Sequence, residues 1–223
     1  MCGIVGSPNI SMFEVMMEAN VERGDFSTGV LQLKKRTGHE TFKKEGLINF
    51  DQDLILDSSK RYYIGHVQAP TSGERGWGYE TSHPFFTLDW AIVHNGVLTN
   101  DVKIRKNELP HCENPVDSSL IAEILQKNTP GKGTMNLEQQ YGIICNALKM
   151  LEGTFALAIV YLPTNTIHIV RQGSILHIDQ KGNFSTIKGK TFDLVPEGIV
   201  YRLNRSKWQE VGPFETKSPF VFV

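Results

Sequence analysis

The chain begins with Met1-Cys2-Gly3-Ile4-Val5-Gly6, the stretch that bears most strongly on its fold and its chemistry. A methionine before a small residue is a substrate for ordinary processing, and its removal leaves Cys2 with a thiol and a free α-amine. A free thiol has a pKa of about 8.5 and an α-amine one of about 7.7–8.0, so near neutrality the amine can accept the thiol proton. Cys2 would then be nucleophile and base together. The alternative is a small buried hydrophobic residue at the start of an edge strand, as most free cysteines are.

The composition is that of a globular chain without a nucleic-acid or membrane partner. The 223 residues are 40% hydrophobic and 21% charged, enough for one large domain or two small ones, and no break between domains is visible. The net charge of -1 and the dispersed Lys and Arg residues leave no basic patch for nucleic acid or an anionic membrane. There is no apolar run of about 18 residues and no signal peptide, so we expect a cytoplasmic protein.

The cysteines predict neither disulfides nor a metal site. Cys2, Cys112 and Cys145 are an odd number without paired spacing. His111 beside Cys112 is only a weak metal signal, because a second ligand pair is missing. The sequence also lacks a nucleotide-binding loop of the Gly-x-x-x-x-Gly-Lys type. We therefore expect no metal and no cofactor.

Apolar spacing predicts helices in the middle of the chain and strands toward both ends. Ser11 followed by Glu14 has the pattern of a capping box for the first helix. The expected helices cover 12–22, 97–109, a segment opening at Asp117, and 136–151. The expected strands cover 2–6, 29–33, 41–44, 61–67, 86–87, 90–93, 154–162, 166–171, 174–179 and 198–203. Because crossover helices do not separate these strands, the order predicts an α+β domain with two antiparallel sheets.

Four stretches carry a family resemblance through their order and spacing. They are Met1 to Gly6, Gly65-His66-Val67 with Thr71-Ser72-Gly73 after it, His94-Asn95-Gly96, and Asp117 at the opening of a helix. Together they strongly resemble the class II, N-terminal-nucleophile glutamine amidotransferase domain of glucosamine-6-phosphate synthase and glutamine PRPP amidotransferase. Segments 23–29, 82–85 and 151–156 extend the resemblance over nearly the whole chain. It implies a four-layer αββα sandwich of the Ntn hydrolase type, formed as a single domain by residues 1–223.

The resemblance also implies a catalytic arrangement. Cys2 would attack a side-chain amide carbonyl, with its own α-amine as the base, to give a thioester and ammonia. The Asn95 side-chain amide and the Gly96 backbone N–H would stabilise the oxyanion. The alternative for His94-Asn95-Gly96 is an ordinary turn, since Asn-Gly is a strong hairpin signal. Its position directly after an apolar strand favours the oxyanion site.

Further residues are implied to bind the substrate. Asp117 resembles the carboxylate that binds the α-amino group of glutamine, although an Asp at the start of a helix can also be its N-cap. Thr71 resembles the hydroxyl residue that contacts glutamine, and its alternative is a turn residue. Ser72 and His94, which belong to the same motifs, are also substrate-binding candidates.

Two positions depart from the family pattern. Gln68 stands where the family has an arginine that binds the α-carboxylate of glutamine. A buried carboxylate without its charged partner costs roughly 2–5 kcal/mol, so glutamine would bind weakly unless Arg75, His66 or Arg61 supplies the charge. The second departure is Asp25-Phe26, where the acidic residue usually comes one place later.

Three hypotheses about function follow from the sequence. Only the segment from Trp208 to Val223 remains after the expected sandwich, so we expect no acceptor domain within this chain. The first hypothesis is a stand-alone glutamine amidotransferase subunit that hydrolyses L-glutamine and supplies ammonia to a separate synthase. The second is an N-terminal cysteine amidohydrolase acting on a γ-glutamyl or other amide. The third is a catalytically silent relative with a binding or regulatory role.

Overall fold

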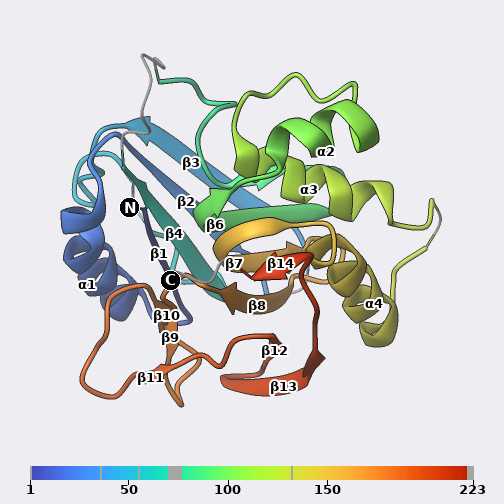
Figure 1. The fold of residues 1–223 in the computed structure, drawn as a ribbon. Helices are drawn as coiled ribbons and strands as arrows, with labels where there is room; N and C mark the ends of the chain where they lie inside the picture. The colour runs from blue at the N-terminus through green and yellow to red at the C-terminus, as the bar shows by residue number, and fades with distance from the viewer. Residues whose placement is uncertain (1, 36, 55, 70–76, 132, 220–223) are drawn as a thin grey trace.

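The computed structural model describes residues 2–35, 37–54, 56–69, 77–131 and 133–219. Two seven-stranded sheets lie face to face, with helices on their outer faces (Figure 1). In the first sheet every pair of neighbouring strands is antiparallel. Its order is β11-β9-β10-β1-β4-β2-β3. Its strands are β1 (Gly3–Ser7), β2 (Ser27–Leu33), β3 (His39–Glu45), β4 (Tyr62–Gln68), β9 (His177–Ile178), β10 (Phe184–Ser185) and β11 (Asp193–Leu194).

The second sheet has the order β13-β12-β8-β7-β6-β5. These neighbours are antiparallel, and β14 adds to β7 in parallel. The long central pair of β6 and β7 forms its middle. The strands are β5 (Phe85–Phe86), β6 (Trp90–Leu98), β7 (Glu152–Tyr161), β8 (Thr166–Gln172), β12 (Ile199–Asn204), β13 (Lys207–Pro213) and β14 (Ser218–Pro219).

Helices cover the outer faces of both sheets. Helix α1 (Ile10–Asn20), which continues into a 3₁₀ turn (Val21–Arg23), packs on β1 and β4. On the other side α3 (Asp117–Lys127) packs on β5 and β6, and α4 (Leu137–Leu148) packs beside α3. Helix α2 (Asp101–Glu108) contacts α3. No helix among the described residues is long and apolar enough to cross a membrane.

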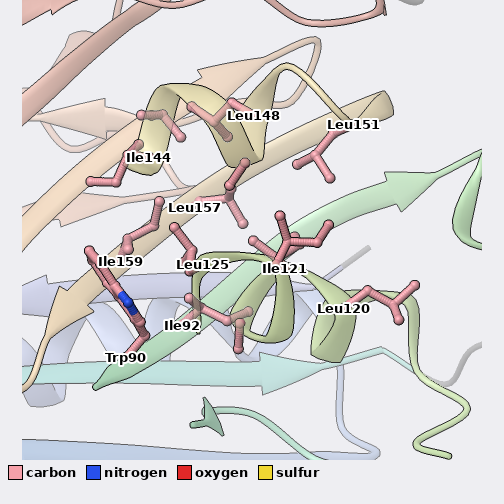
Figure 2. Close-up of a cluster of buried hydrophobic side chains, with 14 of the residues drawn as sticks. Trp90, Ile92, Leu120, Ile121, Leu125, Ile144, Leu148, Leu151, Leu157 and Ile159 are labelled. Atoms are coloured by element: carbon pink, nitrogen blue, oxygen red, sulfur yellow. The ribbon is translucent and has the colours of Figure 1, made fainter. Parts of the chain in front are cut away.

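Apolar side chains fill all three spaces between these layers. Phe13 of α1 packs on Tyr63 of β4, with ring centroids 5.7 Å apart. Between the sheets the core includes Ile4 of β1 and Ala91 of β6. The third core joins the second sheet to α3 and α4 through ten labelled side chains that point toward one another (Figure 2): Trp90, Ile92, Leu120, Ile121, Leu125, Ile144, Leu148, Leu151, Leu157 and Ile159. The predicted αββα sandwich of two antiparallel sheets is therefore confirmed.

The ends of two predicted helices are wrong. The first helix starts at Ile10, and its cap is Asn9, whose Oδ1 accepts from the Met12 N–H at 2.9 Å. Asn9 has the extended backbone that a cap needs, whereas Ser11 already lies inside the helix. The helix predicted over 97–109 begins only at Asp101, because β6 remains paired with β7 as far as Leu98.

Candidate active site

Three of the candidate residues lie on strand faces that line the space between the sheets. Side chains alternate along a strand, so residues at even spacing share a face. Cys2 therefore shares a face with Ile4 of β1, and Gln68 shares one with Ile64 of β4. Asn95 in the same way shares a face with Val93 of β6. Ile4, Ile64 and Val93 all belong to the core between the sheets. Strands β1 and β6 lie against each other across this space. The structure thus places the thiol and the amide on facing sides of the same inter-sheet space.

Cys2 is held at the start of the central strand of the first sheet. It directly precedes β1, which pairs with β4 on one side and β10 on the other. Burial raises the pKa of the Cys2 thiol, and a hydrogen bond from the backbone of Ala69 opposes that rise. Because the pKa is raised, Cys2 is mostly a neutral thiol at pH 7 and needs a base to become a nucleophile.

The buried histidines are not placed to be that base. Burial lowers the pKa of His66 to about 3, and burial also lowers the pKa of His83 well below its usual value. The His66 ring stacks on His83 at 3.8 Å between centroids, and its Nε2 lies 3.1 Å from the carbonyl oxygen of His94. Within the described part of the chain no imidazole hydrogen-bonds to Cys2. His66 and His83 therefore pack against each other and do not activate the Cys2 thiol.

Asn95 and Gly96 lie inside a strand, so their interpretation as a turn is wrong. Asn95 pairs with Ala156, and Gly96 with Phe155, in the continuous β6–β7 ladder. The Asn95 side chain is 3% exposed, and among the described residues no hydrogen bond occupies its amide. A buried amide aimed into the space beside a thiol is suited to meet a developing oxyanion.

Gly96 has a backbone that only glycine adopts easily. Its φ is 155°, and a Cβ at this position would lie 2.0 Å from the Thr154 carbonyl oxygen. We expect Gly96→Ala to destabilise the fold by roughly 1–3 kcal/mol and to lower kcat, because the strand must move and carry the N–H with it. Thermal unfolding and steady-state kinetics test this, with Gly131→Ala as the control, since open space surrounds Gly131. Unchanged stability and rate in Gly96→Ala would contradict it.

Asp117 connects the end of β6 to α3. The N-cap of α3 is Val116, so the N-cap interpretation of Asp117 is wrong. Its Oδ2 accepts from the Leu98 N–H at 2.9 Å and its Oδ1 from the Ser118 N–H at 2.7 Å. The carboxylate is partly exposed and retains further lone pairs for a ligand. It lies close enough to Cys2 for its charge to raise the thiol pKa.

His94 faces the helical layer, on the side of β6 opposite to Asn95. Its Nδ1 lies 2.8 Å from the Ser118 Oγ, and the side chain is 2% exposed. Ser118 Oγ in turn donates to the Asp117 Oδ1 at 3.2 Å. Through Ser118, His94 therefore supports the Asp117 carboxylate from the helical side of β6.

Gln68 ends β4 beside the thiol. Its side chain is 2% exposed, and its Oε1 accepts from the Ser27 Oγ on β2 at 2.9 Å. This contact leaves the amide nitrogen as the group that Gln68 can offer to a ligand. Three further substrate-binding candidates, Thr71, Ser72 and Arg75, lie outside the described residues.

Arg23 is a site residue that the sequence reasoning did not select. It ends the 3₁₀ turn after α1, and its Nε donates to the Cys2 carbonyl oxygen at 2.8 Å. The sequence signal for it was segment 23–29, which follows the first helix and carries part of the family resemblance. Gly24 brings the chain against the end of β4, because a Cβ there would lie 2.3 Å from the Ala69 nitrogen.

Curated relatives match the chain over most of its length. A glutamine–fructose-6-phosphate aminotransferase from Fusobacterium nucleatum is 28% identical over 181 residues, which is 72% of this chain and 27% of the relative. An amidophosphoribosyltransferase from Haemophilus influenzae is 29% identical over 138 residues, which is 56% of this chain and 27% of the relative. The chain spans about a quarter of the length of these relatives. No protein-family model matches the chain.

Solved structures share the fold. The glutamine PRPP amidotransferase from B. subtilis superimposes with a TM-score of 0.74 at 18% identity, over 95% of this chain and 49% of that one. A glutamine aminotransferase class-II domain protein from Silicibacter pomeroyi superimposes with a TM-score of 0.59 at 12% identity, over 96% of this chain and 100% of that one. The chain is thus similar in sequence to glutamine-dependent aminotransferases and amidophosphoribosyltransferases, and it shares the fold of a class II glutamine amidotransferase domain.

Proposed function

We propose that this domain hydrolyses the side-chain amide of L-glutamine at Cys2 and releases ammonia. The observation that supports the proposal is the end of the sandwich where Cys2 precedes β1: the Asp117 charge reaches the thiol there, and the buried Asn95 side chain lies on the inter-sheet face of β6. The thiol supplies the nucleophile, the amide a donor for the oxyanion, and the carboxylate a partner for the α-amino group of the substrate.

Each step follows from these groups. With Met1 removed, the α-amine of Cys2 takes the thiol proton while sulfur attacks the amide carbon. Asn95 and the Gly96 N–H bind the resulting oxyanion. When the tetrahedral intermediate collapses, the C–N bond breaks, the ammonium of Cys2 returns its proton to the leaving nitrogen, and ammonia departs. Water, deprotonated by the same amine, then cleaves the thioester to give glutamate and the free thiol.

We further propose that the ammonia goes to a separate acceptor enzyme. The Silicibacter pomeroyi chain supports this arrangement, because this fold accounts for all of that chain. The curated relatives extend well beyond the matched region, in keeping with an acceptor domain in the same chain. A partner that co-purifies with the domain and incorporates ¹⁵N from amide-labelled glutamine, but not from external ¹⁵N-ammonium, would establish the transfer.

A second candidate is an amidohydrolase whose substrate has no free α-carboxylate. The observation that favours it is Gln68, an uncharged side chain buried where the family has an arginine. Ammonia release from glutamine and from its α-carboxamide separates the two. Faster turnover of glutamine supports the glutaminase, faster turnover of the carboxamide supports the amidohydrolase, and no turnover of either supports a silent binding relative.

An arginine at position 68 also distinguishes the glutaminase from the amidohydrolase. If the site binds glutamine, we expect Gln68→Arg to lower KM for glutamine. The gain in binding free energy should be up to a few kcal/mol, the range of a desolvated charge-assisted pair. If the native substrate lacks that carboxylate, the new guanidinium is buried without a partner and activity falls. KM for glutamine and for its α-carboxamide is measured in both proteins. Tight glutamine binding in the wild type with no gain from the arginine would mean that another cation already binds the carboxylate.

A further inference from the structure

We propose that Arg23 binds the α-carboxylate of the substrate, in place of the arginine that is missing at position 68. The inference rests on the proposed action on glutamine and names the specificity-determining cation of that site. Arg23 lies at the right place, because its Nε donates to the Cys2 carbonyl oxygen at 2.8 Å. The next residue, Gly24, packs so closely on β4 that a Cβ there would lie 2.5 Å from the Gln68 carbonyl oxygen.

The Arg23 guanidinium has N–H groups that no described residue uses. Arginine presents five N–H groups in a planar fork that matches a carboxylate. The single hydrogen bond of Arg23 to a described residue uses Nε, so both Nη groups remain. Among the described residues no carboxylate lies within ion-pair distance of Arg23. Its side chain is half-buried, and burial lowers its pKa from the usual value. A partly desolvated cation without an anion is well suited to receive one from a ligand.

Other described cations do not fit this role. His66 is fully buried and neutral, because burial lowers its pKa to about 3. Arg61 precedes β4 whereas Gln68 ends it, and seven residues at roughly 3.3 Å each put about 20 Å between the two ends of the strand. The Lys43 Nζ donates to the Tyr79 carbonyl oxygen at 2.9 Å and sits over the Tyr79 ring. Arg75, which lies outside the described residues, is left to the experiment.

The charges around Cys2 also match a free α-amino acid. Among the described residues, the charged side chains that act on the Cys2 thiol are Arg23 and Asp117, and they shift its pKa in opposite directions. A substrate whose amide lies on the thiol would meet a cation and an anion nearby. Arg23 would take the α-carboxylate, with the Gln68 amide as a neutral second donor, and Asp117 would take the α-ammonium. This pairing favours glutamine over an amide without a carboxylate.

Binding to the inert Cys2→Ala variant tests the proposal independently of turnover. Calorimetry measures the Kd of glutamine and of its α-carboxamide for Cys2→Ala. The same two Kd values are measured for three double variants, in which Cys2→Ala is combined with Arg23→Gln, with Arg75→Gln or with the matched control Arg61→Gln. We expect Arg23→Gln to weaken glutamine by about 30-fold or more while the carboxamide changes little. The control should leave both Kd values unchanged. Adding Gln68→Arg to Arg23→Gln should recover much of the loss, because it supplies the cation from the neighbouring position.

Several results would overturn the role of Arg23. One is an equal loss for both ligands, which would mean that Arg23 only positions the backbone of Cys2. A second is a selective loss of glutamine affinity in Arg75→Gln but not in Arg23→Gln. A third is the absence of glutamine binding to Cys2→Ala. Ammonia release by the wild type is measured separately. If the wild type is active and Arg23→Gln weakens both ligands equally, only the role of Arg23 is wrong. If the wild type releases no ammonia, the proposed glutaminase function is wrong.

Discussion

Cys2→Ala should abolish ammonia release from glutamine, with a fall in kcat of roughly 10⁴–10⁶-fold, as when the nucleophile of other covalent hydrolases is removed. Alanine keeps the small size and the backbone of Cys2, including the carbonyl oxygen bound by Arg23. Only the sulfur is lost, and with it the thioester route. The loss should therefore appear in kcat, while glutamine still binds.

The other two cysteines supply matched controls. Cys112 and Cys145 are free and half-buried like Cys2, but both pack against the core on the helical side of the second sheet. Cys145 lies in α4, and its Sγ donates to the Pro213 carbonyl oxygen at 3.7 Å. Cys112→Ala and Cys145→Ala should keep kcat near the wild-type value. Glutaminase activity that survives in Cys2→Ala, or that disappears in either control, would contradict Cys2 as the nucleophile.

Asn95→Ala should lower kcat by roughly 10²–10³ and change KM little. The side-chain amide meets charge that exists only in the transition state, and one oxyanion donor contributes roughly 2.7–4 kcal/mol there. Asn95→Asp should be at least as damaging, because it places an anion where the oxyanion forms. Steady-state kinetics with glutamine measure both variants.

Asn100→Ala is the structural control for Asn95. Asn100 bridges the backbone, since its Nδ2 donates to the Met150 carbonyl oxygen and its Oδ1 accepts from the Glu152 N–H. Losing these bonds should destabilise the fold by about 1–3 kcal/mol without a matching fall in kcat. If Asn95→Ala behaves in the same way, with lower stability and an unchanged kcat, its amide belongs to the packing and the oxyanion role is wrong.

The layered fold could be predicted because apolar periodicity and strand order are local features of the sequence. The hairpin expected over 29–33 and 41–44 is confirmed by β2 and β3. Short strands such as β10 and β11 escaped prediction, because two residues carry no periodic signal and their pairing depends on distant partners. The 174–179 strand shrinks to His177–Ile178 for the same reason. Helix starts were misjudged where a cap or a continued strand pairing decided them.

The site could be predicted as far as single residues carried a chemical signature. Cys2 and Asn95 lie on strand faces that line the inter-sheet space, and Asp117 lies close enough to shift the thiol pKa. Arg23 could not be selected, because its role depends on a 2.8 Å contact with the backbone of Cys2 that no spacing rule predicts. The missing charge at Gln68 was visible in the sequence, whereas its bond to Ser27 required the fold.

The central claim is that the thiol and the free α-amine of one residue, Cys2, carry out the reaction. Intact-mass measurement of active protein, before and after rapid quenching with saturating glutamine, tests it most directly. The account predicts a resting mass without Met1 and, after quenching, a γ-glutamyl adduct that maps to Cys2. Full activity in a protein that retains Met1 would contradict the account, because the amine would then be an amide and could not take the thiol proton.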